Sequence, residues 1–131
     1  MEATPLRLHP GDDLRGALDA ALAARSCAAG FVLSGIGSLG AARLRYAGIE
    51  TPATLLGDLE ILTLAGTLSP TGSHLHMSVS DSEGRVRGGH VAPGCIVRTT
   101  AELLVAWLPA WRFTRELDPA TGFAELTIRK T

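Results

Sequence analysis

The chain has few cysteines, few aromatic residues and almost no net charge. Its 131 residues include 2 cysteines, and 5% are aromatic. Cys27 and Cys95 are too few and too far apart in sequence for the disulfide framework of a small secreted domain, so we expect both thiols to be reduced. The 12 basic and 13 acidic residues leave a formal net charge of −1, which argues against a protein that captures nucleic acid by bulk electrostatics.

Long apolar runs are also missing. No stretch reaches the roughly 18 apolar residues that span a bilayer, and Met1–Pro5 lacks the basic-then-apolar pattern of a signal peptide. We therefore expect a cytoplasmic protein with no membrane association. No internal repeat or linker divides the sequence, and its 46% hydrophobic and 19% charged content is typical of a compact globular protein. We interpret residues 1–131 as a single domain.

The polar and apolar pattern predicts one helix and about eight strands. Asp12 or Asp13 is expected to cap an amphipathic helix of about four turns that ends at Gly30, and His9 just before it is interpreted as a loop residue. The predicted fold class is α+β around a mostly antiparallel sheet. The expected strands are residues 6–8, 31–40, 41–46, 58–68, the two arms of a hairpin between 72 and 92, and residues 95–107, 111–117 and 123–128.

Residues 35–40 spell G-x-G-x-x-G, which in other proteins binds dinucleotides. In a dinucleotide-binding unit a helix follows these glycines, and its N-terminal amides face the pyrophosphate. Here the predicted helix comes before the motif, and another predicted strand follows it. We therefore interpret the motif as coincidental. Its glycines are expected to let the sheet bend or let another backbone approach closely.

Three of the four histidines lie between Gly72 and Arg98, in the predicted hairpin. Residues two apart on a strand point to the same face and lie roughly 6.5 to 7 Å apart, so the rings of His74 and His76 can converge. Whether His90 joins them depends on the turn that connects the two strands.

The length of this turn decides the register of the hairpin. A two-residue loop would place His90 opposite Leu75, on the wrong face. A three-residue loop, Ser82-Glu83-Gly84, uses the glycine as its left-handed residue and brings His76 opposite His90. The position of the glycine favours this second register. The residues then expected to face the core are Leu75, Met77, Val79 and Val91.

Three neutral imidazoles suit zinc and other borderline divalent ions, and three protein ligands leave one position open. The alternative is that His74, His76 and His90 are polar strand residues on a solvated or subunit-facing surface. Glu60 is the single charge in the middle of the apolar strand expected at 58–68. It is expected at a sheet edge or facing a partner, and the alternative is a hydrogen-bond acceptor behind the histidines.

Four blocks along the chain carry a family resemblance: LRLHPGDDL, FVLSGIGSL, DLEILTLAGTLS and GSHLHMSVSDSEGRVRGGHVAPGCIV. Together they resemble the plant and prokaryote conserved (PPC) domain in its stand-alone bacterial and archaeal form, from Leu6 to about Ile128. The resemblance implies an α+β fold with a seven- or eight-stranded antiparallel sheet, and a homotrimer. It also implies a metal bound by histidines that match His74, His76 and His90, and the preference of imidazole for borderline divalent ions makes zinc the expected one.

The PPC family is often labelled DNA-binding because its plant relatives carry AT-hooks, short Arg-Gly-Arg-Pro cores that enter the minor groove. This sequence contains no such core, so the reason for the DNA-binding label does not apply to it. In the plant proteins the PPC domain itself looks like the assembly module. Arg85 and Arg87 lie in the hairpin, where they form either a small basic patch of a trimer or a solvated strand edge.

Three functions remain open at this point. The first is a trimeric metal-binding or assembly module that is linked to transcription through a partner. The second is a zinc-dependent hydrolase or lyase in which the ion activates a water molecule, with Glu60, Asp81 or Glu83 as the available bases and no catalytic residue assigned. The third is direct DNA binding by the trimer, which the net charge disfavours, so that any affinity for DNA is expected to be weak.

Overall fold

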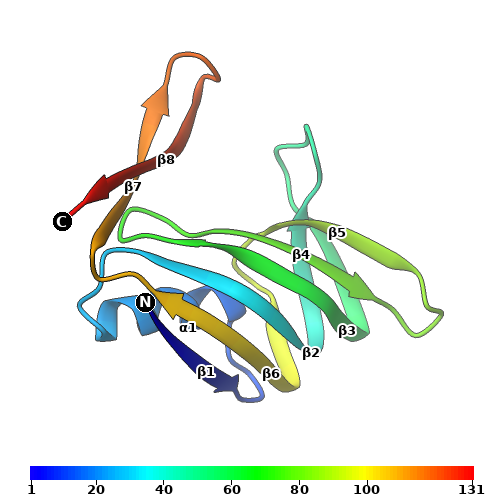
Figure 1. Ribbon diagram of the computed structural model, residues 1–131. Coiled ribbons are helices and arrows are strands. Elements are labelled where there is room, and N and C mark those ends of the chain that lie inside the picture. The colour runs from blue at the N-terminus through cyan, green and yellow to red at the C-terminus, as the bar shows by residue number, and fades with distance from the viewer.

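The computed structural model describes all 131 residues as one helix and eight strands (Figure 1). Antiparallel strands dominate and a single short helix accompanies them, in agreement with the predicted α+β class. No helix is long and apolar enough to cross a membrane. In chain order the elements are β1 (Glu2–Leu8), α1 (Leu14–Ala24), β2 (Gly30–Arg45), β3 (Ala53–Leu68), β4 (His74–Ser80), β5 (Val86–Val91), β6 (Ile96–Trp107), β7 (Trp111–Asp118) and β8 (Phe123–Lys130).

Six of the strands form one antiparallel sheet in the order β1-β6-β2-β3-β4-β5. The sheet curls so strongly that β5 pairs with β2 as well as with β4. This second pairing sets Leu44 opposite Val91 and Arg45 opposite His90. The curl therefore gives the sheet an inner face around the core and an outer face. In β4 the polar residues His74, His76 and Ser78, which alternate with buried apolar residues, lie on the outer face.

The strands β7 and β8 form a hairpin that is a second sheet of its own, and it projects from the body of the protein in Figure 1. The expectation of one seven- or eight-stranded sheet is wrong in this respect. The chain turns after β6, and the backbone amide of Phe113 in β7 donates to the carbonyl of Ala28 at 2.9 Å. Because Ala28 lies in the loop before β2, this contact holds β7 beside that loop and away from the sheet edge.

The helix α1 starts as predicted and ends earlier. The carboxylate of Asp13 caps it by accepting a hydrogen bond from the amide of Gly16 at 2.8 Å. Its last residue is Ala24, and Ser26 follows with a left-handed φ of 51°. A helix continuing to Gly30 is therefore wrong, because the chain reverses at Ser26 to enter β2.

The segment with the G-x-G-x-x-G motif lies inside one 16-residue strand, β2, where two shorter strands were expected. No helix follows the glycines, so the structure rules out the dinucleotide-binding arrangement. Gly37 has a φ of +152°, and a Cβ atom there would lie 2.4 Å from the carbonyl oxygen of Thr100. The prediction that a glycine permits close backbone approach is confirmed at this position.

The core lies between the inner face of the curled sheet and α1. The helix contributes Leu14, Leu18 and Leu22, all at most 3% exposed. Both cysteines are free thiols, as expected, and Cys95 is fully buried. The residues of the histidine hairpin that were expected to face the core are all buried: Leu75, Met77, Val79 and Val91.

Candidate metal centre

The turn between β4 and β5 sets which residues of the two strands lie opposite each other. Gly84 is left-handed with a φ of +76°, and its amide donates to the carbonyl of Asp81 at 3.0 Å. The amide of Asp81 donates to the carbonyl of Arg85 at 3.0 Å, which closes a three-residue loop. The predicted register is confirmed, because His76 lies opposite His90.

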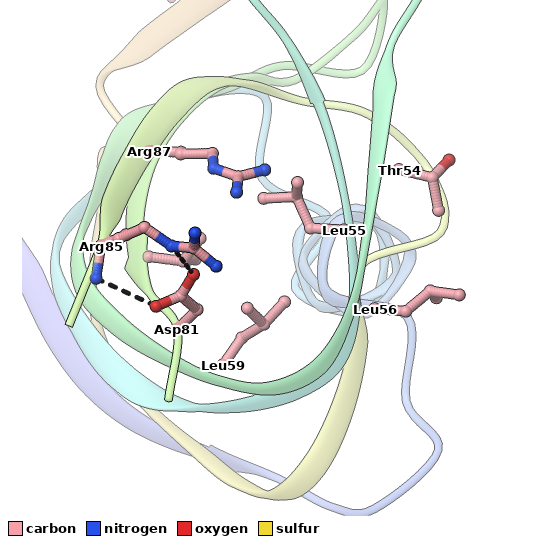
Figure 2. A pocket seen from close by; sticks show the side chains of 8 residues that line it. Thr54, Leu55, Leu56, Leu59, Asp81, Arg85 and Arg87 are labelled. Carbon is pink, nitrogen blue, oxygen red and sulfur yellow. Dashed lines mark hydrogen bonds and ion pairs between the residues drawn. The ribbon is translucent and has the colours of Figure 1, made fainter. Parts of the chain in front are cut away.

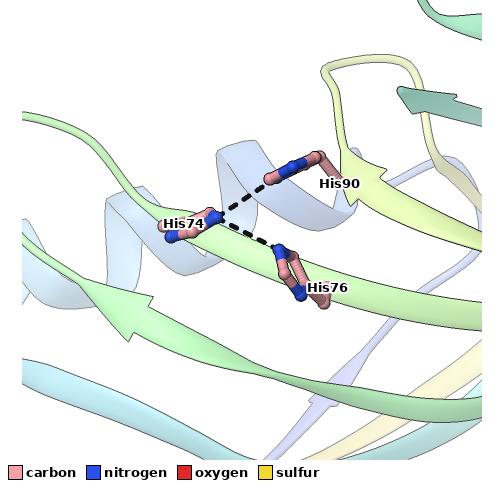
Figure 3. Close-up of side chains that lie close together, drawn as sticks. All are labelled: His74, His76 and His90. Carbon is pink, nitrogen blue, oxygen red and sulfur yellow. Dashed lines mark hydrogen bonds between the residues drawn. The ribbon is translucent and has the colours of Figure 1, made fainter. Parts of the chain in front are cut away.

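The rings of the three histidines converge on the outer face of the sheet (Figure 3). The Nε2 atom of His74 lies 3.1 Å from Nδ1 of His90 and 3.1 Å from Nε2 of His76. One ligand atom from each ring lies within 4.8 Å of the others. His76 is exposed, whereas His74 and His90 are half-buried, so solvent reaches the cluster from one side.

The spacing and the donor type of this cluster fit a borderline divalent ion. Two nitrogen ligands on a tetrahedral zinc ion, each about 2.0 Å from it, are about 3.3 Å apart. The two 3.1 Å separations in the cluster are close to that value. Without an ion, Nε2 of His74 carries either one lone pair or one proton, so it cannot form a full hydrogen bond with both neighbouring nitrogens at once.

The surroundings of the cluster keep two of its rings neutral. The pKa of His74 is lowered to about 4, first by burial and then by the positive charge of Arg115 and the two other histidines. The pKa of His90 is also lowered, first by burial and then by Arg45 and His76. Neutral imidazole is the form that binds a metal ion.

The β7–β8 hairpin brings two charged residues to the cluster that the sequence analysis missed. The Nη2 atom of Arg115 donates to Oγ1 of Thr67 at 2.7 Å, and Thr67 is the strand partner of His74. The charges of Arg115 and Glu125 both act on the pKa of His74, Arg115 lowering it and Glu125 raising it. No local sequence pattern indicates that Arg115 or Glu125 lies near the histidines, because only the docking of the hairpin places them beside the cluster.

The bases that the sequence offered do not gather at the histidines. Glu60 is exposed and lies opposite Ser80, four residues along β4 from His76. Its expected edge position is wrong, because β3 pairs with β2 on one side and with β4 on the other. Asp81 is engaged at the turn, where its carboxylate accepts from Nε of Arg85 at 2.9 Å. Glu83 lies 3.6 Å from the same guanidinium.

A concavity near the hairpin opens on the other face of the sheet (Figure 2). Arg87 lies opposite the buried Val79, so it belongs to the inner face at the open end of the curl. Because Arg85 is paired with Asp81, only Arg87 presents a free cation there, which weakens the basic-patch interpretation. The cavity of about 230 Å³ is lined by Thr54, Leu55, Leu56, Leu59, Val79, Asp81, Arg85 and Arg87.

The chain matches a family model and two longer proteins of known sequence. The model of the Plants and Prokaryotes Conserved (PCC) domain matches residues 1–109. Bifunctional protein GlmU from a Synechococcus strain is 49% identical over 125 residues, which is 95% of this chain and 20% of that protein. A second Synechococcus strain has a GlmU that is also 49% identical. The chain thus spans about a fifth of the length of these relatives.

Solved structures share the fold over nearly the whole chain. A hypothetical protein from Salmonella is 42% identical with a TM-score of 0.95, covering 98% of this chain and 94% of its own. A metal-containing protein from Archaeoglobus fulgidus is 25% identical with a TM-score of 0.81, covering 97% and 94%. A candidate DNA-binding protein from Bacteroides thetaiotaomicron is 23% identical with a TM-score of 0.85, covering 95% and 91%, and shows a common fold only.

Proposed function

The chain belongs to the Plants and Prokaryotes Conserved domain family, and from that premise we propose that His74, His76 and His90 bind a divalent metal ion, most naturally zinc. The observation that carries this proposal is the convergence of one nitrogen from each ring, with two separations of 3.1 Å. The relative from Archaeoglobus fulgidus, described as metal-containing, supports it. Three protein ligands leave the fourth position for water or another group.

We further propose that the domain acts as a homotrimeric binding or assembly module, linked to transcription through a partner. Apolar side chains exposed on the three neighbouring strands β6, β2 and β3 support an association between copies. The match to one fifth of the GlmU proteins supports a module that also occurs joined to other domains. Direct DNA binding is a minor part of this proposal, because a chain of net charge −1 has little excess positive charge to bind the phosphate backbone.

A zinc-dependent hydrolase or lyase is the second candidate, and one observation favours it. Such a reaction needs an acid or base beside the ion, which when bound lowers the pKa of a water molecule. Glu125 of β8 is half-buried and lies close enough to His74 for its negative charge to oppose the lowering of the pKa of that ring. Glu125 is therefore the residue to replace in a search for hydrolysis, and an activity that Glu125→Gln abolishes without loss of metal would support this candidate.

Metal content tests the first proposal directly. Protein purified without an affinity tag should contain about one zinc ion per chain, or take one up from micromolar zinc at neutral pH. His76→Ala should lose most of the metal and keep its fold, because the ring is exposed on the outer face. His9→Ala is the matched control, since His9 is exposed in the loop before α1. A parent protein that takes up no metal would rule the proposal out.

A further inference from the structure

Arg115 is a half-buried cation without an acidic partner. The ion pairs of the structure involve Arg25, Arg85, Arg98 and Arg129. Arg115 instead donates from Nη2 to the neutral hydroxyl of Thr67. Burial is the first cause that lowers the pKa of Arg115. Since a guanidinium has five donors, most of its hydrogen-bonding capacity stays unused by the protein.

The position of this guanidinium is fixed on the histidine face. Thr67 and His74 are directly opposite each other on β3 and β4, and opposed residues of an antiparallel pair share a face. The hydroxyl of Thr67 thus holds Arg115 beside the ring of His74. A second bond, from the Arg115 amide to Oγ1 of Thr71 at 2.7 Å, anchors the strand β7 at the same place.

The positive charge of Arg115 beside the histidine cluster needs an explanation, because a cation next to three metal ligands repels a divalent cation. Glu125 is the acidic residue that acts on both His74 and Arg115, yet it forms no ion pair with Arg115. Arg45 adds another positive charge near His90. An anion bound between the metal position and Arg115 would remove the repulsion and fill the unused donors of the guanidinium.

We propose that Arg115 and the open position at His74, His76 and His90 together bind a small oxyanion, the carboxylate or phosphate group of a ligand. The inference rests on the proposed metal centre and extends it to the kind of ligand that the centre receives. A planar guanidinium recognises both groups through paired oxygen atoms. Arg115 also lies beyond residue 109, where the match to the family model ends, so the inference concerns the hairpin of this chain.

Anion binding to the cobalt(II)-loaded protein tests the inference. Zinc and cobalt stoichiometry is measured first for the parent, Arg115→Gln and Arg115→Lys. Acetate and inorganic phosphate are then titrated separately, and visible absorption of the cobalt reports on its coordination. We expect Arg115→Gln to weaken the preferred anion roughly 10-fold or more, the size of a lost charge-assisted hydrogen bond. Arg115→Lys should recover part of the affinity, because it keeps the charge and loses the fork.

Two controls separate a local effect from a loss of structure. Arg112→Gln removes an exposed cation from the same strand and should leave anion affinity unchanged. Thr67→Val keeps the guanidinium and removes its tether, so anion affinity should fall less than in Arg115→Gln. Metal binding by Arg115→Gln should be as tight as in the parent or tighter, because a nearby positive charge is gone.

The outcomes distinguish this inference from the proposed function. A parent that binds metal while neither anion alters the cobalt spectrum would overturn the inference alone. Equal anion affinity in the parent and in metal-loaded Arg115→Gln would also overturn it. A parent that binds no metal would overturn the proposed function and the inference together. A response to acetate only assigns the site to carboxylates, and a response to phosphate only assigns it to phosphate groups.

Discussion

His74 is the residue at which the fold changes side-chain chemistry most clearly. Its Nε2 atom faces a nitrogen of each of the other two rings, and its pKa is lowered to about 4, first by burial. On an exposed strand the same imidazole would be half protonated near its reference pKa of about 6.5. The local environment therefore keeps the His74 ring neutral at mildly acidic pH.

This environment predicts how the affinity for metal depends on pH. Protons compete with metal for each ring, so affinity must fall as pH falls. For a ring whose folded-state pKa is lowered, competition begins below the reference pKa of about 6.5, and for His74 it becomes strong only near pH 4. We therefore expect zinc competition assays to show substantial binding at pH 6 and loss of binding toward pH 4.

An NMR titration of the imidazole resonances in metal-free protein provides the independent measurement. The His74 ring should titrate near pH 4, and the His90 ring should titrate below the reference value. A His74 ring that titrates at or above 6.5 would contradict the proposed environment.

At the scale of single elements, the histidine hairpin was predictable because its information is local. Alternation along β4 assigns His74 and His76 to one face, and the glycine in the turn fixes the register of β5. The buried set opposite them follows from the same alternation. These rules need only neighbouring residues, so the sequence is sufficient to place the three histidines on one face.

Other elements depend on contacts between distant segments, which the sequence does not display. The pattern of β7 and β8 predicts a hairpin correctly, but it does not say whether that hairpin joins the main sheet. Its docking beside Thr67 and Thr71 places Arg115 at the site. The helix end was also missed, because the reversal at Ser26 uses a left-handed serine where a glycine was expected.

Two glycines with different surroundings give a prediction about element stability. In Gly84→Ala the new methyl group meets nothing within 4 Å, so the left-handed backbone is the main cost, about 1 kcal/mol. In Gly37→Ala the methyl group would clash with the carbonyl oxygen of Thr100 in β6, so we expect a loss on the order of 3 kcal/mol.

Denaturant unfolding of both variants measures these losses of unfolding free energy. Each variant serves as the control for the other, since both replace a glycine of positive φ with alanine. Losses of equal size would show that close approach between β2 and β6 does not matter for stability. A metal-loaded Gly84→Ala should keep the register, because a single strained residue costs less than exposing the buried face of β4.

For the molecule as a whole, the charge balance predicts its behaviour with DNA. A chain of net charge −1 without an AT-hook displaces few counterions, so binding should be weak and independent of sequence. Fluorescence anisotropy with two unrelated duplexes should show any binding at 50 mM salt disappear at physiological salt. Tight binding that distinguishes the two duplexes at physiological salt would contradict this expectation.

Association between copies is the other expectation at the scale of the whole molecule, and the outer face of the sheet supports it. Leu33, Ile36, Leu62 and Leu104 are between 38% and 53% exposed on three neighbouring strands. Monomeric proteins rarely leave several such side chains together in water. We expect light scattering at micromolar concentration to give about three times the 13.7 kDa of one chain.

A matched pair of isoleucines tests which surface holds the assembly together. Ile36 lies on β2 within the outer face and is 53% exposed, whereas Ile49 lies in the loop before β3 and is 52% exposed. Ile36→Glu should lower the measured mass, because it sets a charge into the apolar contact at each subunit. Ile49→Glu adds the same charge at equal exposure and should leave the mass unchanged. If both variants keep the mass of the parent, or the parent itself is a monomer, copies of the chain do not associate through this face.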